Sequence, residues 1–337
     1  MKRIRLVGVL LVLIAVVVAP IGAKGPRFNH FIVFGDSLSD TGNDFILSSA
    51  LGAQPALPPS VSPNRTYFNG RFSNGPVAVE HLWGLLNSGP PSLIPPSLAD
   101  LRVPAHGAVS FAFGATGSGV SSEFRGVDVP GLLTQIELFR RSLRGKHAPP
   151  HALFSVFTGA TDYIVAPGEA PLNPVDVVNN IGRGITTLYG LGARVIVVPN
   201  LPDLGAIPLV SPGSPGAQLL SQLGVLHNQL LALKLQVLSV QLPDIQLVRV
   251  DLHALTPPPG TIVTVPALDV LVPPVGGVPT SLCIFVNPAA CPNVPTFAVS
   301  PSFFFWDAQH PTTAAHAFIG SYMHGVLQQA LADENED

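Results

Sequence analysis

The chain of 337 residues has few charged side chains and few cysteines. Only 11% of its residues are Asp, Glu, Lys or Arg, against about 25% in an average soluble protein, while 47% are hydrophobic. An intrinsically disordered chain has the opposite balance, so disorder is excluded. The net charge of −3, with no basic run beyond the N-terminus, disfavours a nucleic-acid partner held by phosphate neutralisation. Two cysteines are too few for a four-thiolate zinc site.

The first 23 residues have the order of a secretory signal peptide. A cationic start (MKRIR, residues 1–5) precedes an apolar run over residues 6–19, and the small residues Gly22 and Ala23 follow. The run is shorter than the ~20 apolar residues of a membrane-spanning helix. We therefore expect a signal peptide over residues 1–23, a single domain over residues 24–337, and a secreted or otherwise extracytoplasmic protein. An uncleaved N-terminal anchor is the alternative.

Export changes the interpretation of the two cysteines. Cys283 and Cys291 lie eight residues apart in a proline-containing stretch. In an oxidising compartment this spacing favours a local disulfide that closes the loop. Two free buried thiols are the alternative. No neighbouring group would lower the pKa of either thiol, so neither is expected to be a nucleophile.

The pattern of apolar runs predicts one α/β domain. Five short runs rich in β-branched and aromatic residues each end at a turn signal, over residues 31–34, 108–113, 152–157, 194–198 and 246–250. Their continuous apolar character indicates strands buried on both faces, as in a parallel sheet covered by helices. Helical spacing lies between them, over residues 77–86 and 175–189. A third helix is expected to have one buried face, formed by Leu219, Leu220, Leu223, Leu226, Leu230, Leu233 and Val237. Proline-rich stretches over residues 53–63, 88–104 and 256–279 are expected to be ordered surface loops.

Polar or small residues follow several of these predicted strands, where ligands bind in an open α/β sheet. Ser37 lies in a turn after the first run, where a helix N-terminus would favour a developing anion; capping that helix is the alternative role. Gly114 follows the second run and would let a backbone N–H approach a substrate oxygen closely. Residues 159–163 (GATDY) follow the third.

Asp307 and His310 stand three residues apart near the C-terminus, so both can lie on one side of a turn. The carboxylate can orient the imidazole, which can then deprotonate a serine. Such a pair alone is common, but the chain order Ser…Asp…His, together with two small-residue turns, favours a serine hydrolase. The sequence has no His-Glu-x-x-His motif, which would favour metal catalysis. No spacing of acidic residues singles out a carboxylate pair for glycoside hydrolysis.

Several of these segments resemble the sequence blocks of the GDSL, or SGNH, family of serine esterases and lipases. The matches lie at residues 34–43 (FGDSLSDTGN), 68–76 (FNGRFSNGP), 111–116 (FAFGAT), 199–205 (PNLPDLG) and 305–316 (FWDAQHPTTAAH). The resemblance implies a three-layer α/β/α sandwich with a five-stranded parallel sheet of the flavodoxin-like type. It implies Ser37 as nucleophile, His310 and Asp307 as its partners, and no metal or organic cofactor.

The resemblance also implies an oxyanion hole, where the sequence departs from the family pattern. The backbone N–H groups of Ser37 and Gly114 and the side chain at position 161 are the implied donors. The second block usually has two adjacent glycines, whereas Phe113 precedes Gly114 here. The third block usually has an asparagine where this chain has Thr161, whose hydroxyl sits on a shorter side chain.

We therefore expect an exported carboxylic-ester hydrolase that acts through an acyl-enzyme. An acyltransferase of the same family and a non-catalytic binding protein on the same scaffold are the alternatives. The low charge and the apolar loops favour lipid-like or aryl ester substrates and a transient contact with a lipid surface.

Overall fold

The computed structural model describes residues 28–164, 170–255, 282–294 and 304–333. The predicted signal peptide and the third proline-rich stretch lie outside these ranges. Within them the chain forms a five-stranded parallel sheet in the order β2-β1-β5-β6-β7. The strands are β1 (His30–Gly35), β2 (Gly107–Ser110), β5 (Ala152–Phe157), β6 (Val195–Pro199) and β7 (Gln246–Val250).

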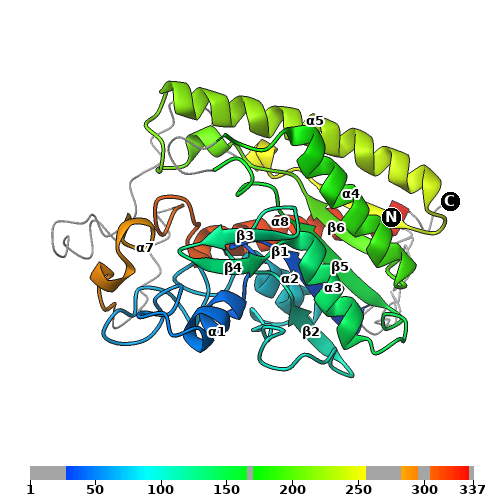
Figure 1. Ribbon diagram of the computed structural model, residues 1–337. Helices are drawn as coiled ribbons and strands as arrows, with labels where there is room; N and C mark the ends of the chain where they lie inside the picture. The colour runs from blue at the N-terminus through cyan, green and yellow to red at the C-terminus, as the bar shows by residue number, and fades with distance from the viewer. Residues whose placement is uncertain (1–27, 165–169, 256–281, 295–303, 334–337) are drawn as a thin grey trace, which may run out of the picture.

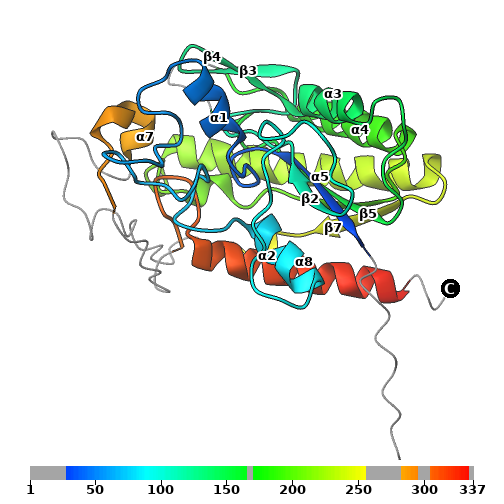
Figure 2. The same ribbon diagram turned by 90° about the horizontal axis from the view of Figure 1, so that it is seen from below.

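Helices cover both faces of this sheet (Figures 1 and 2). One face carries α2 (Ala78–Leu86) and α8 (Thr313–Asp333), which pack against each other. The other face carries α3 (Leu132–Ser142), α4 (Pro174–Gly190) and α5 (Pro215–Gln241). The predicted α/β/α sandwich with a five-stranded parallel sheet is therefore confirmed, and its strand order is the flavodoxin-like one.

The sheet is built from the five predicted runs because its central strands are buried on both faces. Every residue of β1 and β5 is buried, which explains why these segments are continuously apolar instead of alternating. The second run ends as a strand at Ser110, three residues earlier than predicted. Phe111 and Phe113 continue beside β1, with their N–H groups donating to the carbonyls of Val33 and Gly35.

Helix α5 corrects the predicted face of the leucine-rich segment. Leu219, Leu226, Leu233 and Val237, assigned to the buried stripe, are 44–60% exposed. Leu220 of the predicted stripe is buried, and the buried side otherwise carries His227, Leu231, Leu235 and Leu238 among others. Because both sides of this helix are apolar, spacing alone could not orient it. Among the described residues α5 is also the one helix long and apolar enough to span a membrane, by length and composition alone.

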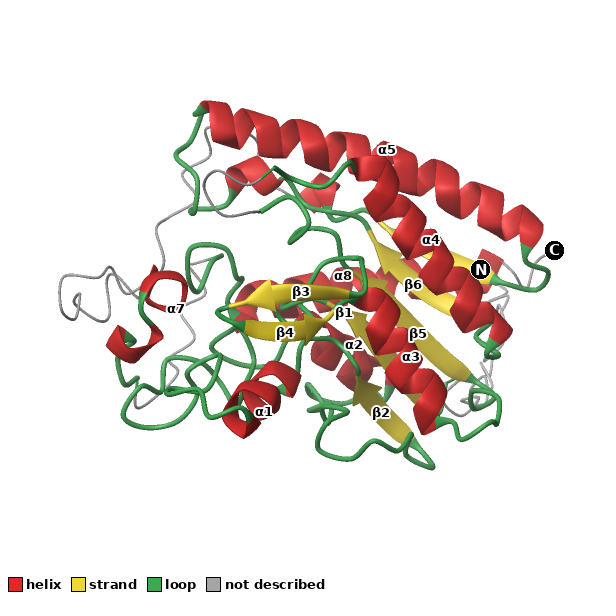
Figure 3. Cartoon of the chain, viewed as in Figure 1, coloured by secondary structure: helices red, strands yellow, loops and turns green. Residues whose placement is uncertain are grey.

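Shorter elements lie outside the three layers (Figure 3). Helix α1 (Asn43–Ala50) follows β1, and the antiparallel strands β3 (Ser121–Phe124) and β4 (Val127–Pro130) form a half-exposed hairpin that was not predicted. Helix α7 (Cys283–Val286) and the 3₁₀ turns η1 (Leu204–Ala206), η2 (His253–Leu255) and η4 (Pro288–Ala290) complete the described part.

Candidate active site

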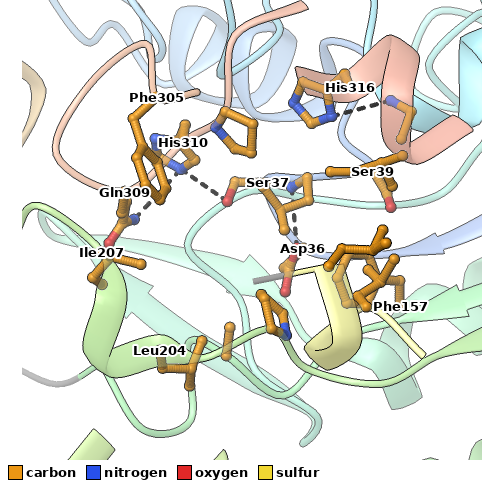
Figure 4. Close-up of a pocket in the computed structure, with 18 of the residues that line it drawn as sticks. Asp36, Ser37, Ser39, Phe157, Leu204, Ile207, Phe305, Gln309, His310 and His316 are labelled. Atoms are coloured by element: carbon orange, nitrogen blue, oxygen red, sulfur yellow. Dashed lines mark hydrogen bonds between the residues drawn. The ribbon is translucent and has the colours of Figure 1, made fainter. Parts of the chain in front are cut away.

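An apolar pocket opens beyond the carboxyl ends of the parallel strands, with Ser37 and His310 in its wall (Figure 4). Residues that follow β1, β5, β6 and β7 all reach it. This is the edge where ligands bind in open α/β sheets. Its apolar lining comes mainly from Leu38, Val79, Phe157, Ile164, Leu204, Ile207, Leu252, Leu255, Phe304, Phe305, Phe318, Ile319 and Met323.

Ser37 lies in a hydrogen-bonded turn directly after β1. The N–H groups of Ser39 and Asp40 both donate to the Asp36 carbonyl, which closes that turn. Gly35, which precedes Asp36, admits no side chain, because a Cβ atom there would lie 2.1 Å from the Phe157 carbonyl oxygen. The predicted helix N-terminus at Ser37 is wrong, since α1 begins six residues later at Asn43.

Asp40 accounts for this displacement of the helix start. One of its carboxylate oxygens, Oδ1, accepts the N–H groups of Gly42 and Asn43 at 2.7 Å each, and Oδ2 accepts that of Asp44 at 3.2 Å. These are the orphan donors at the start of α1, so Asp40 satisfies the helix N-terminus from inside the loop. Ser37 is thereby left outside the helix.

The same carboxylate corrects the role expected of Gly114. The Gly114 N–H donates to Asp40 Oδ2 at 3.0 Å and is not free to bind a substrate oxygen. Glycine is needed here for packing, because a Cβ atom would lie 2.2 Å from the Phe72 ring and 2.8 Å from the Asp44 carboxyl. The next residue, Ala115, has a φ of 50°, in the left-handed region that favours glycine. No hydrogen bond of its N–H is found within the described residues.

The structure brings Ser37, His310 and Asp307 together in one hydrogen-bonded chain. Ser37 Oγ lies 2.9 Å from His310 Nε2, and His310 Nδ1 lies 2.7 Å from Asp307 Oδ2. Because a carboxylate only accepts, Nδ1 carries the proton, and Nε2 accepts the Ser37 hydroxyl. Figure 4 shows Ser37 and His310 pointing toward each other. All three side chains are buried or nearly so, at 8%, 2% and 0% exposed.

The turn between Asp307 and His310 explains their spacing of three residues. Asp307 Oδ1 accepts the backbone N–H groups of Gln309 at 2.9 Å and His310 at 2.7 Å. This turn directs the second carboxylate oxygen at the imidazole of the same turn. Two aromatic rings contact that imidazole: the Phe72 ring is tilted with its centroid 5.0 Å away, and the Phe285 ring is stacked at 13° with its centroid 6.0 Å away.

Tyr67 is a contact of this site that the sequence did not predict. Its hydroxyl donates to Asp307 Oδ2 at 2.7 Å, across 240 residues of sequence. Tyr67 lies just before the family-like stretch of residues 68–76, and that proximity was the one available signal. Burial and the nearby Asp307 raise the pKa of the Tyr67 hydroxyl well above its ordinary value, so it stays protonated.

Thr161 lines the same pocket as Ser37, in the turn after β5. The turn is held by the next residue, because Asp162 Oδ2 accepts the Ser118 N–H at 2.8 Å. Burial raises the pKa of Asp162 to about 6, although the hydrogen bonds from the Ser118 N–H and hydroxyl act in the opposite direction. The turn that carries Thr161 is therefore joined by a buried hydrogen bond to the segment around Ser118.

Asp36 is a second buried carboxyl in the pocket wall, next to the serine. Its Oδ1 accepts the Leu38 N–H at 3.0 Å, while its Oδ2 has no partner among the described residues. Burial raises the pKa of Asp36 to about 7, and the Leu38 hydrogen bond only partly opposes this. Around neutral pH the group is thus present in both charge states beside Ser37.

A disulfide joins Cys283 to Cys291, and the segment that it closes packs against the site. Both cysteines are buried in a small hydrophobic cluster with Tyr67, Phe72 and Trp306. The segment also carries Phe285, the ring that stacks on His310. Among the described residues, no group of three or more His, Cys, Asp or Glu side chains is arranged to hold a metal ion.

A serine, a histidine and an aspartate hydrogen-bonded in series, at the carboxyl edge of a parallel sheet, are the arrangement that serine hydrolases use. The chain belongs to the GDSL-like lipase/acylhydrolase family, whose model matches residues 31–323. It is a carboxylic ester hydrolase by that membership.

Individual relatives cover much of the chain. A GDSL esterase/lipase of Arabidopsis thaliana is 24% identical over 353 residues, which span 91% of this chain and 92% of that protein. A phosphatidylcholine-sterol acyltransferase of Aeromonas hydrophila is 29% identical over 206 residues, 61% of this chain and 54% of that protein. Among solved structures, an acetyl xylan esterase covers 88% of this chain and 98% of its own at 10% identity, with a TM-score of 0.37.

Proposed function

We propose that the chain is an exported serine esterase in which Ser37 is the nucleophile, His310 the general base and Asp307 the residue that orients it. The observation that carries this proposal is the continuous hydrogen-bonded chain from Ser37 Oγ to Asp307, at 2.9 and 2.7 Å. Distances in this range are those that proton transfer to a positioned base requires. Export is supported by the N-terminal pattern and by the disulfide, which an oxidising compartment maintains.

The reaction proceeds in two balanced halves. His310 Nε2 takes the hydroxyl proton as Ser37 Oγ attacks the ester carbonyl carbon, and Asp307 stabilises the imidazolium that forms. His310 then returns that proton to the alkoxide that leaves, so an alcohol departs and an acyl-Ser37 ester remains. Water attacks this ester with His310 again as base, which releases the carboxylic acid and restores the hydroxyl.

The oxyanion of each tetrahedral intermediate needs donors that have no other partner. The Ser37 N–H meets this condition within the described residues, and so does the N–H of Ala115, next to the fixed Gly114. We assign these two groups, with the Thr161 hydroxyl, as the donors, and thereby replace the Gly114 N–H. Removing one such donor costs about 2.7–4 kcal/mol in a comparable hydrolase, so a weak donor at position 161 lowers turnover without abolishing it.

The pocket favours an apolar acyl or alcohol group in the substrate. Its lining is dominated by Leu, Ile, Val, Phe and Met side chains. Phe318 lines the pocket and is 57% exposed, so an apolar surface continues outward from it. An ester with a medium or long apolar chain would bury that chain here, gaining about 0.8 kcal/mol per CH₂.

Transfer of the acyl group to an alcohol is the second candidate function. It is supported by the similarity to an acyltransferase, which covers 61% of this chain. The two reactions share the acyl-Ser37 ester and differ only in the acceptor. Product partition between free acid and new ester, measured with added glycerol or a sterol, separates them.

The test of the proposed function is a chain-length series of p-nitrophenyl esters, assayed with wild type and with Ser37→Ala. We expect hydrolysis that improves as the acyl chain grows from two to about eight carbons, because each CH₂ adds buried apolar surface. Ser37→Ala should reduce kcat by at least about 10⁴-fold, as for other triad members. A protein that hydrolyses no ester, or a Ser37→Ala variant as active as wild type, would support the binding-protein alternative instead.

A further inference from the structure

The Asp307 carboxylate is surrounded by donors on all its acceptor positions. Oδ1 accepts the N–H groups of Gln309 and His310, at 2.9 and 2.7 Å. Oδ2 accepts His310 Nδ1–H and the Tyr67 hydroxyl, each at 2.7 Å. An ionised carboxylate has about four lone-pair sites, so none is left over. Tyr67 is the one of these donors that comes from a distant part of the chain.

The Tyr67 hydroxyl is held in place by contacts of the Tyr67 backbone and ring and of the neighbouring Thr66. Its own backbone N–H donates to the Pro59 carbonyl at 2.9 Å, and its ring is fully buried, meeting the Phe72 ring edge to face. The carbonyl of the preceding residue, Thr66, accepts the Trp306 indole N–H at 3.2 Å. Because Trp306 directly precedes Asp307, the loop that carries Tyr67 and the turn that carries Asp307 are fixed to each other twice.

We propose that Tyr67 is a positioning residue of the catalytic site, which acts on His310 through Asp307. Its hydroxyl holds Oδ2 in line with Nδ1 and withdraws part of the negative charge that the imidazolium meets. The inference rests on the proposed function of Ser37 and His310. It predicts that Tyr67 sets both the turnover number and the pH at which His310 loses its proton.

Other titratable groups also face His310 and must be kept constant in any test. Asp36 faces it from the turn after β1, and its charge favours the imidazolium. His316 faces it from α8, where burial lowers its pKa to about 3 and so keeps that imidazole neutral in the assay range. Both remain in the wild type and in the variants below, so a difference between the two proteins reports the change at Tyr67.

The test is Tyr67→Phe in the full chain, which removes one oxygen atom and retains the buried ring. We expect kcat to fall about tenfold with KM unchanged, the effect of losing one hydrogen bond to a charged group. The acidic limb of the profile of kcat/KM against pH should move upward by about 0.5–1 unit, because the less compensated carboxylate favours the imidazolium. p-Nitrophenol release should be followed at its isosbestic wavelength.

Tyr189→Phe is the matched control, since Tyr189 lies at the far end of α4 and contacts the Arg194 guanidinium. It should leave kcat, KM and the acidic limb unchanged. A second variant tests the sign of the effect. Incorporation of 3-fluorotyrosine at position 67 makes the phenol a stronger donor, so the acidic limb should move to lower pH than in wild type.

Two results would overturn the proposal. One is a Tyr67→Phe variant with wild-type kcat and an unmoved acidic limb. The other is a loss of activity that appears as a raised KM or a lowered Tm with the limb unmoved, which indicates a purely structural role. Neither affects the proposed function, which stands or falls with wild-type hydrolysis and its loss in Ser37→Ala.

Discussion

At the scale of single residues, the site depends on three buried carboxyl groups that differ in how many hydrogen bonds they accept. Asp40 and Asp307 each accept four hydrogen bonds and fix the backbone around them. Asp36, by contrast, keeps one oxygen without a partner, and its pKa is raised to about 7 by burial. Asp307 builds the turn that places His310, Asp40 fixes the start of α1 and the Gly114 N–H, and Asp36 adds a charge beside Ser37 that depends on pH.

The oxyanion site carries the most specific prediction at this scale. Thr161→Asn restores the amide of the family pattern on a longer side chain, in a turn that Asp162 already fixes. We expect kcat for a p-nitrophenyl ester to rise about tenfold or more, since one full oxyanion donor is worth ~10²–10³ in turnover. Steady-state kinetics of wild type and variant provide the measurement. Thr161→Val, which removes the hydroxyl but keeps the shape, should lower kcat.

The contrary result would be equal turnover in wild type, Thr161→Asn and Thr161→Val. In that case the side chain at position 161 does not contact the oxyanion, and the backbone donors carry the stabilisation alone.

The sequence revealed those residues whose partners are local or follow a strand. Asp307 and His310 were predictable because one turn joins them, and Ser37 because it follows a buried strand. Tyr67 was not, because its bond to Asp307 spans 240 residues and a buried tyrosine is usually a packing residue. Gly114 was assigned the wrong role because nothing in its neighbourhood showed that Asp40 binds its N–H.

At the scale of elements, the segment closed by the Cys283–Cys291 disulfide packs against the loop that carries Tyr67, more than 200 residues earlier in the chain. Asn64 Nδ2 donates to the carbonyls of Ala289 and Cys291, at 3.0 and 2.9 Å, and the Val294 N–H donates to the Arg65 carbonyl at 2.7 Å. The loop that carries Tyr67 thus lies directly against the segment that carries Phe285. The hydrogen bond from Tyr67 to Asp307 and the stacking of Phe285 on His310 therefore both depend on this one junction.

Removing the disulfide should loosen that junction. For Cys283→Ser/Cys291→Ser we expect a loss of about 2–3 kcal/mol, the chain-entropy value for a loop of this length, and a lower kcat because Phe285 is less ordered over His310. Chemical denaturation monitored by tryptophan fluorescence measures the first effect, since Trp306 lies in the same cluster. Equal stability and equal kcat in the two proteins would show that the segment does not support the site.

The elements themselves were predicted unevenly, for physical reasons. The strands β1 and β5 were the most evident because burial on both faces removes the polar residues that make other strands ambiguous. The exposed leucines of α5 were misassigned because helical spacing gives no direction when both sides are apolar. The β3-β4 hairpin was missed because its strands are only four residues long and mostly half exposed or exposed.

At the scale of the whole molecule, a parallel sheet collects the ends of distant strands at one edge. Ser37 follows β1, the turn of Thr161 follows β5, and the Asp307–His310 turn precedes α8, so Ser37 and His310 meet although they are 273 positions apart. The sheet order places β1 between β2 and β5, so Ser37 follows an inner strand of the sheet, next to the turn after β5. The apolar pocket beside it determines which esters reach the serine.

The most direct measurement is covalent trapping of the nucleophile with diisopropyl fluorophosphate, followed by intact-mass and peptide mass spectrometry. We expect one adduct per chain, located on Ser37, absent in Ser37→Ala and formed much more slowly in His310→Gln, because the imidazole must take the serine proton. An ester-hydrolysing protein whose adduct forms on another residue, or forms on Ser37 at the same rate without His310, would contradict the account.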